Sequence, residues 1–391
     1  MPATISIFPV GNGDMTLITL DNGQTVLIDC NILQAADDDN DDTLDVAEEL
    51  RKRLSRDALG RFFVNVMLLS HPDQDHCSGL KNHFHLGTPD DWDDDDDKIV
   101  INEMWSSPIV FRRAGKQLSL VPNAKAWATE ARRRVAVFRD NMDTTPVAGD
   151  RILILGEDEN GKTEDLSDIL IKVDELITAA DRVNSNAFEA RLLGPLPISE
   201  DEDEEESLSK NRSSVILRFS LAGDKVVDSG RYLTGGDAEV GVWARLWRKH
   251  KSKNSDWLTY HVMLSPHHCS WHSLSEDSWS DLGEDVEVDP DARDALSQTL
   301  NGAVIVASSK PIKDDDSDPP CIRAKHEYVS MVNDDDDRFY CTGEYPKESA
   351  PEVLEFSITS LGPEKKGRTL ISVAPVLGVG ATSRTPRDHG A

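Results

Sequence analysis

The first thirty residues alternate between apolar and polar side chains, with the period of two that is typical of half-buried β-strands. Two turn sequences, GNGD and DNG, interrupt this alternation. The pattern therefore predicts three short strands, at residues 4–9, 15–20 and 25–29. Residues 44–59 follow the helical period instead, and Thr43 is the expected N-cap.

Strands and helices alternate along the rest of the chain. The unbroken apolar run FVNVMLL at residues 63–69 predicts a buried strand, and a helix is expected from Leu80 onward. Further strands are predicted at residues 99–105, 151–155, 214–220, 231–234, 261–264 and 303–308. Further helices are predicted at residues 124–141, 165–180 and 238–249. This alternation, in two similar halves, predicts an α/β fold in which two sheets are sandwiched between helices.

The chain has 391 residues and a formal net charge of −30. At ~100–200 residues per domain, this length allows two or three domains or one large α/β domain with insertions. Much of the negative charge lies in acidic runs, at residues 37–42, 90–97, 200–206, 314–318 and 334–337. We interpret these runs as solvated loops, because none has the glycine-containing spacing of an EF-hand calcium loop.

The remaining composition restricts the cellular setting and the partners. No apolar run approaches the ~20 residues needed to span a bilayer, and the first fifteen residues lack the features of a signal peptide. We therefore expect a soluble, cytoplasmic protein without a membrane partner. The five cysteines are scattered and odd in number, so we expect free thiols. The charge argues against a protein that coats nucleic acid, which needs a local excess of Lys and Arg.

The densest group of chemically capable residues directly follows the predicted strand at 63–69. The segment reads His71-Pro72-Asp73-Gln74-Asp75-His76, with four potential metal ligands in six residues. Imidazole and carboxylate ligands together suit Zn, Mn or Fe. A turn at a strand end can direct several side chains toward one point, so this segment predicts part of a metal site.

Two later segments follow predicted strands in the same way. Asp237 comes after the strand at 231–234 and two glycines, and the pair His267 and His268 comes after the strand at 261–264. Either segment alone is a weak signal, since an Asp after glycine is most often a turn or a helix cap. Because all three segments terminate strands, we expect one metal site assembled from separate strand ends.

These motifs resemble those of the metallo-β-lactamase superfamily, most closely the hydrolase domain of ComEC-type DNA-uptake proteins. That group has the motifs V-G-Q-G-D, I-D-G-G, T-H-x-H-x-D-H-x-G-G, L-T-G-D-x-E and H-H-G-S in this order. The counterparts here are VGNGD at 10–14, IDCN at 28–31, SHPDQDHCSG at 70–79, LTGGDAE at 233–239 and HHCS at 267–270. The resemblance covers roughly residues 4–86 and 210–310, and it implies an αββα sandwich with acidic-loop insertions and a metal site at one edge.

The resemblance also implies roles for individual residues. The ligands would be His71 and Asp73 on one ion, Asp75, His76 and His267 on the other, and Asp237 as the bridge. Asp29 would orient the histidine loop from behind. Asp75 and His268 would be the catalytic residues, with His268 as the proton donor to the leaving group. The implied cofactor is one or two divalent ions, Zn or Mn.

One position departs from the family pattern. Asp73 stands where the family has its second histidine. His83 and His85 are the only histidines between His76 and Asp237. Two alternatives follow. An oxygen-rich second position would favour Mn or Mg, or Asp73 binds nothing and a single Zn occupies the remaining site.

The function that the motifs favour is hydrolysis by metal-bound hydroxide, with a phosphodiesterase or nuclease as the first hypothesis. The substrate would be a phosphodiester, with DNA or a nucleotide as candidates, and basic segments could contact its phosphates. These segments lie at residues 112–116, 132–134 and 245–253. The alternatives are a hydrolase of small esters, lactones or thioesters, and a regulatory, partner-binding module with a degenerate metal site.

The resemblance divides the chain into four parts. Residues 1–86 and 211–375 are the expected halves of the sandwich, residues 87–210 an insertion, and residues 376–391 a flexible tail. The insertion is the expected surface for a protein partner or for substrate selection, because additions there leave the scaffold intact.

Overall fold

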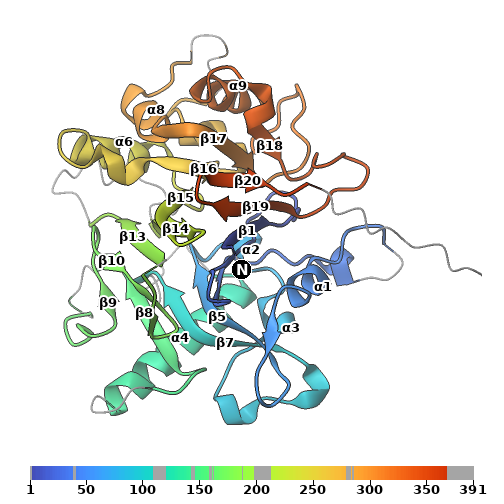
Figure 1. Cartoon of the computed structure of the whole chain (residues 1–391), viewed down its shortest axis with the longest axis vertical. Coiled ribbons are helices and arrows are strands. Elements are labelled where there is room, and N and C mark those ends of the chain that lie inside the picture. Colours follow the sequence, from blue (N-terminus) through green and yellow to red (C-terminus); the bar gives the residue numbers. More distant parts are fainter. Residues whose placement is uncertain are drawn as a thin grey trace, which may run out of the picture.

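The computed structural model describes residues 2–37, 41–108, 120–141, 146–157, 161, 163–186, 188–197, 213–278, 283 and 286–367. Within these residues the chain is an α/β protein with two mixed β-sheets flanked by helices (Figure 1). The strands of the first sheet are β1 (Thr4–Ile7), β2 (Thr16–Thr19), β3 (Thr25–Ile28), β4 (Ser55–Arg56), β5 (Phe62–Leu69), β6 (Phe84–His85), β7 (Ile99–Ser106), β8 (Arg151–Leu155), β9 (Leu170–Ile171), β19 (Leu354–Thr359) and β20 (Gly362–Lys365).

The second sheet is built mainly from the later part of the chain. Its strands are β10 (Leu176–Ile177), β13 (Phe188–Gly194), β14 (Ile216–Gly223), β15 (Val226–Thr234), β16 (Tyr260–Leu264), β17 (Thr299–Ala307) and β18 (Phe339–Cys341). The strands β15, β16, β17 and β18 run parallel to one another, so their carboxyl ends share one edge. In the first sheet β3, β5, β7 and β8 are likewise parallel. A separate pair, β11 (Ala179–Ala180) and β12 (Val183–Asn184), forms a small hairpin.

The helices gather in two groups. The first half contributes α1 (Val46–Arg51), α2 (Gln74–Cys77), α3 (Leu80–His83) and α4 (Pro122–Asp140), and the second half α6 (Val240–His250), α8 (Pro290–Leu296) and α9 (Ile322–Met331). In Figure 1 the second group lies at the top, beside β16, β17 and β18, and α4 lies at the lower end beside β8. No helix in the described ranges has the length and apolar character needed to cross a membrane.

The two sheets share one hydrophobic core. A row of aromatic rings links them, with centroids 6.4 Å apart for Trp105 and Phe188, and 6.1 Å apart for Phe188 and Phe219. Tyr232 continues the row on β15, and its hydroxyl donates a hydrogen bond of 3.3 Å to Thr16 on β2. All these rings are fully buried. Removal of this apolar surface from water therefore holds the sheets together.

Most of the predicted elements are confirmed, and two helices differ. The helix expected at 44–59 is confirmed only for the short helix α1, because β4 lies in the same range and pairs with β5. The N-cap of α1 is Asp45 rather than Thr43. The helix expected at 165–180 is wrong. This range contains two edge strands instead: β9 pairs with β8 at the edge of the first sheet, and β10 pairs with β13 at the edge of the second. Asp174 between them has a left-handed backbone (φ 77°) that a helix does not tolerate.

The segment 87–210 contributes strands to both sheets. It contributes β7 and β8 to the first sheet, next to β5, and β13 to the second sheet, next to β14. Its acidic run at 200–206, and the tail at 376–391, lie outside the described residues. The described parts of the other acidic runs are mostly exposed, as predicted. All five cysteines are free, as predicted, and all five are buried.

Candidate metal centre

The three predicted ligand segments meet because three strands end at one place. The strands β5, β15 and β16 end at Leu69, Thr234 and Leu264, and the ligand residues follow within a few positions. Two backbone hydrogen bonds connect these ends to neighbouring segments. Val215 N–H, directly before β14, donates to the Ser70 carbonyl after β5 (2.9 Å), and His267 N–H, after β16, donates to the Gly236 carbonyl after β15 (3.0 Å). The site thus belongs to both sheets.

Backbone conformation brings the later segments close to the first. Gly236 has φ 49°, and a Cβ atom at this position would lie 2.8 Å from the Ser70 hydroxyl, so glycine is required. His267, His268 and Cys269 are three consecutive non-glycine residues in the left-handed region, with φ of 49°, 53° and 68°. Such residues are rare and strained, and they persist where the surrounding structure enforces them.

Asp237 lies at the centre of the site, and its two oxygens face different histidines. Oδ1 lies 3.0 Å from Nε2 of His76 and 3.4 Å from Nε2 of His268. Oδ2 lies 3.3 Å from Nε2 of His71 and 3.7 Å from Nε2 of His267. Four imidazoles therefore surround one buried carboxylate, two on each side.

Each side also has a carboxylate from the loop after β5. Asp75 lies 3.3 Å from Nε2 of His268, and Asp73 lies 3.8 Å from Nε2 of His71. We call Asp75, His76 and His268 the Oδ1 set, and His71, Asp73 and His267 the Oδ2 set. The ligand atoms of the Oδ1 set and of Asp237 all lie within 4.8 Å of one another, which is close enough for one ion.

The Nδ1 atoms of three histidines face residues outside these sets. Asp29 lies 2.8 Å from Nδ1 of His76 and accepts two bonds of 2.6 Å from Ser70. Asp14 lies 3.3 Å from Nδ1 of His268, and the Ser70 hydroxyl lies 3.2 Å from Nδ1 of His71. Such outer partners fix the orientation of a ligating imidazole and leave Nε2 free for a metal.

Asp14 is the site residue that the sequence did not assign. It is 3% exposed, and it also forms a compact group with Asp29 and His76. Gly13 lets it approach, because a Cβ atom at Gly13 would lie 2.6 Å from the Asp75 carbonyl oxygen. The available signal was the VGNGD turn itself, whose second glycine allows this close packing.

The charges of the site are strongly coupled. Burial disfavours a charged His76, but Asp237 and Asp29 outweigh burial and hold the pKa of His76 well above its usual value. Burial opposes ionisation of His268 too, yet Asp237, Asp14 and Asp75 raise its pKa to about 10. Against their own burial, the histidines hold the pKa of Asp237 well below its usual range and lower that of Asp75 to about 2. Burial lowers the pKa of His267. The carboxylates of Asp237 and Asp75 are thus ionised near neutral pH and can bind a cation.

Several buried polar atoms of the site make no hydrogen bond within the part of the chain that the structure describes. They include Nε2 of His71, Nε2 of His268 and Nδ1 of His267, while Nδ1 of His268 and Oδ1 of Asp14 face each other at 3.3 Å without hydrogen-bond geometry. A buried polar atom without a partner costs roughly 1–3 kcal/mol, and a bound cation would satisfy those that face Asp237. The donor set of imidazole and carboxylate suits a divalent transition metal. These buried groups are therefore able to bind one or two metal ions.

The centre opens into a cleft of about 760 Å³. Acidic residues outnumber cationic ones in its lining, which includes Asp73, Asp75, Asp237 and Glu239 beside His267. The one cationic residue in the described lining is Lys310, whose backbone N–H donates to the side chain of Asn12. His268 lies behind this surface, fully buried.

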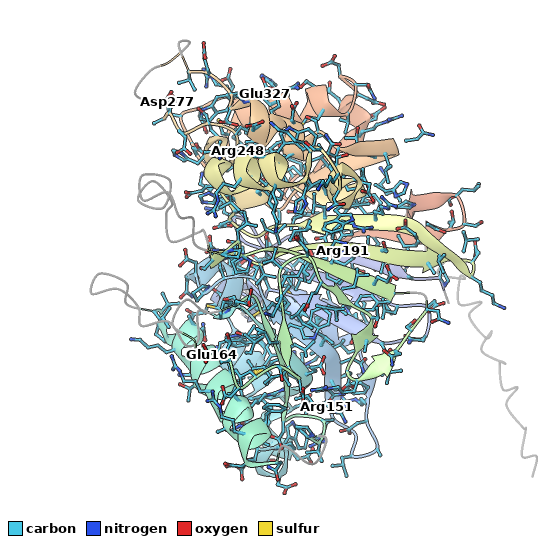
Figure 2. All side chains as sticks on the ribbon, turned by 90° about the vertical axis from the view of Figure 1, so that its left-hand side faces the viewer. Arg151, Glu164, Arg191, Arg248, Asp277 and Glu327 are labelled. Carbon is cyan, nitrogen blue, oxygen red and sulfur yellow. The ribbon has the colours of Figure 1, made fainter. Side chains whose placement is uncertain are left out.

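The basic segments expected to contact phosphates make ion pairs within the chain. Arg133 pairs with Asp150 at 2.6 Å, and Lys249 pairs with Asp174 at 2.9 Å. Arg248 lies 3.9 Å from Asp291, and Figure 2 shows it on α6 in the upper part of the molecule. None of these residues lines the cleft. The segment 112–116 lies outside the described residues.

The cysteines next to the ligand motifs are buried. Burial raises the pKa of Cys77 to about 12 and that of Cys269 well above its usual value. The Cys77 thiol donates to the Asp73 carbonyl at 3.0 Å. Both thiols are therefore protonated and poorly reactive near neutral pH.

Comparison of the chain with models of known protein families and with curated proteins gave no match.

Proposed function

We propose that this protein is a metal-dependent hydrolase with the αββα sandwich of the metallo-β-lactamase fold, and that it cleaves phosphodiesters. The two mixed sheets, their shared core and the buried His/Asp cluster are consistent with that fold. The observation that carries the proposal is the arrangement around Asp237, whose two oxygens each face a separate pair of imidazoles. A carboxylate between two ligand sets suits a two-ion site, which favours in-line displacement at phosphorus.

The residues of the site would have two roles, metal binding and orientation of the histidine rings. Asp75, His76, His268 and Asp237 would hold one divalent ion. When bound, such an ion supplies Lewis-acid chemistry, since it lowers the pKa of water and stabilises negative charge on the substrate. Asp29 and Asp14 would orient the rings of His76 and His268.

We assign His268 to metal binding rather than to proton donation. Its ring is fully buried behind the cleft, and its Nε2 lies 3.3 Å from Asp75 and 3.4 Å from Asp237. A proton donor must reach the leaving group within hydrogen-bond distance, and a ring in this position is better placed to bind an ion than to meet a substrate.

The cleft supports a small substrate. A volume of about 760 Å³ lies within the range for small-molecule sites. The lining has one lysine, and the neighbouring basic segments are paired with carboxylates, so a long polyanion would find few phosphate contacts. We therefore propose a phosphodiester of nucleotide size. The acidic lining favours, as the second candidate, a small ester or lactone.

The test compares these substrates on the full chain. The protein is stripped with a chelator, reloaded with Zn or Mn, and assayed with bis(p-nitrophenyl) phosphate and p-nitrophenyl acetate. We expect metal-dependent cleavage of the phosphodiester that disappears in Asp237→Asn. Cleavage of the ester alone would favour the second candidate. A protein that binds metal and cleaves neither would favour the partner-binding module, with the segment 87–210 as the proposed partner surface.

A further inference from the structure

The Oδ2 side of Asp237 receives only one imidazole from the segment after β5. This segment gives each side one carboxylate and one imidazole, Asp75 and His76 on the Oδ1 side and Asp73 and His71 on the Oδ2 side. His83 and His85 are the only histidines between His76 and Asp237, and neither lines the cleft. The ring of His85 is instead 2.8 Å from the Thr88 carbonyl oxygen. A second imidazole for this side has to come from elsewhere.

His267 is positioned to supply it. Its Nε2 lies 3.7 Å from Oδ2 of Asp237, the same oxygen that faces His71. Its ring lies at 75° to the ring of His268, with centroids 6.1 Å apart, so the two neighbouring rings occupy different places around Asp237. Its Nδ1 is buried and makes no hydrogen bond with any residue that the structure describes, and the residue lines the cleft beside Asp73.

The strained backbone explains how adjacent histidines reach opposite sides of one carboxylate. In a strand, adjacent side chains point to opposite faces, away from a common point. In this loop the left-handed conformation of His267, His268 and Cys269 directs one ring to each oxygen of Asp237. Three strained residues in a row are maintained for a reason, and two ligands from two neighbouring positions provide one.

We propose that His267 and His268 ligate different ions. His268 would bind the ion held by Asp75 and His76, whereas His267 would bind the ion held by His71 and Asp73, in place of a mid-chain histidine. This inference rests on the metal site of the proposed function. The Oδ2 set is less closely spaced, with Asp73 3.8 Å from His71 and His267 3.7 Å from Asp237, and the His267 side chain is 19% exposed whereas those of His76 and His268 are fully buried. The ion at His267 should therefore be the weaker one.

The experiment counts ions rather than turnover. The metal-free full chain is titrated with Zn and with Mn by calorimetry, and bound metal is measured by mass spectrometry after desalting. We expect a tight and a weaker binding event, and His267→Ala and His267→Gln should both lose only the weaker one. Asp73→Ala should lose the same event, and His268→Ala the tight one. The matched control is His272→Ala, because His272 is a half-buried histidine outside the described cleft lining. The His272→Ala protein should bind both ions.

The outcomes separate this inference from the proposed function. Retention of both ions by the two His267 variants, or a parent chain that binds a single ion, overturns the inference. Loss of the same event in His267→Ala and His268→Ala also overturns it, because the two residues would then share one ion. Two ions bound without phosphodiester cleavage would contradict the proposed function and leave this inference standing. Melting curves of the metal-free variants would identify any that fail to fold.

Discussion

The two sides of Asp237 differ in how firmly their ligands are held. In the Oδ1 set, buried carboxylates lie behind both imidazoles, Asp29 at 2.8 Å from His76 and Asp14 at 3.3 Å from His268. In the Oδ2 set, the Ser70 hydroxyl lies 3.2 Å from Nδ1 of His71, and Nδ1 of His267 has no hydrogen-bond partner among the described residues. The Oδ1 set is therefore oriented before an ion arrives, and the Oδ2 set must adjust. We infer that the ions bind in order and with unequal affinity.

We expect the largest effect from a change in Asp237, the carboxylate that both ligand sets share. Asp237→Asn keeps the shape of the side chain but removes the charge that faces both sets. We expect loss of both ions and a fall in hydrolysis of at least ~10²-fold, because a metal ligand acts on the ion and on the transition state. Calorimetry and the phosphodiester assay measure the two effects.

The control for this variant is Asp277→Asn, an exposed carboxylate on a loop of the second half. It should bind metal and cleave substrate as the parent does. Normal metal content in Asp237→Asn would show that Asp237 is a structural residue and that the two sets have no common ligand.

A second variant acts on the Oδ1 set alone. Asp14→Asn removes the carboxylate behind His268 without touching a proposed ligand. Loss of such an outer partner typically reduces metal affinity ~10–100-fold, so we expect the tight ion to bind about that much more weakly while the weaker ion is unaffected. Separate dissociation constants from the Zn titration provide the measurement. A selective loss of the weaker ion would reverse our ranking of the two sides.

A third variant tests the Oδ2 set by placing at position 73 the histidine of the metallo-β-lactamase motif. With Asp73 the set has one more oxygen ligand than it would have with a histidine at this position, which shifts its preference from Zn toward Mn. We expect Asp73→His to increase the Zn-over-Mn preference of the weaker ion by ~10-fold and to leave the tight ion unchanged. Competition titrations with the two metals measure this ratio. If the ratio is the same in the parent, Asp73→His and Asp73→Ala, Asp73 binds nothing.

The cleft residue Lys310 gives a smaller effect. It is the one cation in the described lining and lies outside both ligand sets. Lys310→Ala should raise KM for the phosphodiester several-fold with little change in kcat, because it removes an attraction felt equally by bound substrate and transition state. Lys313→Ala, which removes a surface lysine 3.3 Å from Glu348, is the matched control. Equal KM values in the two variants would exclude Lys310 from substrate binding.

The smallest effect is on the stability of the metal-free protein. His268 has a pKa of about 10 in the folded chain and ~6.5 when unfolded, so the folded state binds the extra proton between these values. The resulting stability is complete below pH ~6.5 and is lost as the pH rises toward ~10. We expect Tm to fall by a few degrees between pH 7 and 9.5, and to change less once metal is bound. A metal-free Tm that rises over this range would contradict the charged state of the Oδ1 set.

Much of the site could be predicted because strand ends are visible in a sequence. The apolar runs before His71, Asp237 and His267 mark where β5, β15 and β16 end. The parallel strands β15 and β16 end at one edge of the second sheet, and the packing of the two sheets brings the end of β5 to the same place. The role of Asp14 was not predictable, because it depends on the packing of the Gly13 turn against the Asp75 carbonyl. Nor could the sequence separate His267 from His268, since only the left-handed backbone determines which oxygen each ring faces.

The fold shows the same limit. The strands with strong apolar runs, such as β5 and β8, lie where the pattern predicts them. The segment 165–180 has apolar residues at a spacing that fits a helix, and Leu166, Ile169 and Ile177 are indeed buried. They are buried in loops and edge strands, however, because free sheet edges pair with β9 and β10. A long-range pairing of this kind overrides local periodicity.

The central claim is that Asp237 and the residues around it hold metal. The most direct measurement is anomalous diffraction from crystals of the full chain grown with Zn or Mn. We predict a strong peak within bonding distance of Asp75, His76, Asp237 and His268, and a weaker peak on the Oδ2 side of Asp237, next to His71 and His267. Crystals with the metal in solution but no peak at Asp237, or with the ion bound elsewhere in the chain, would contradict the claim.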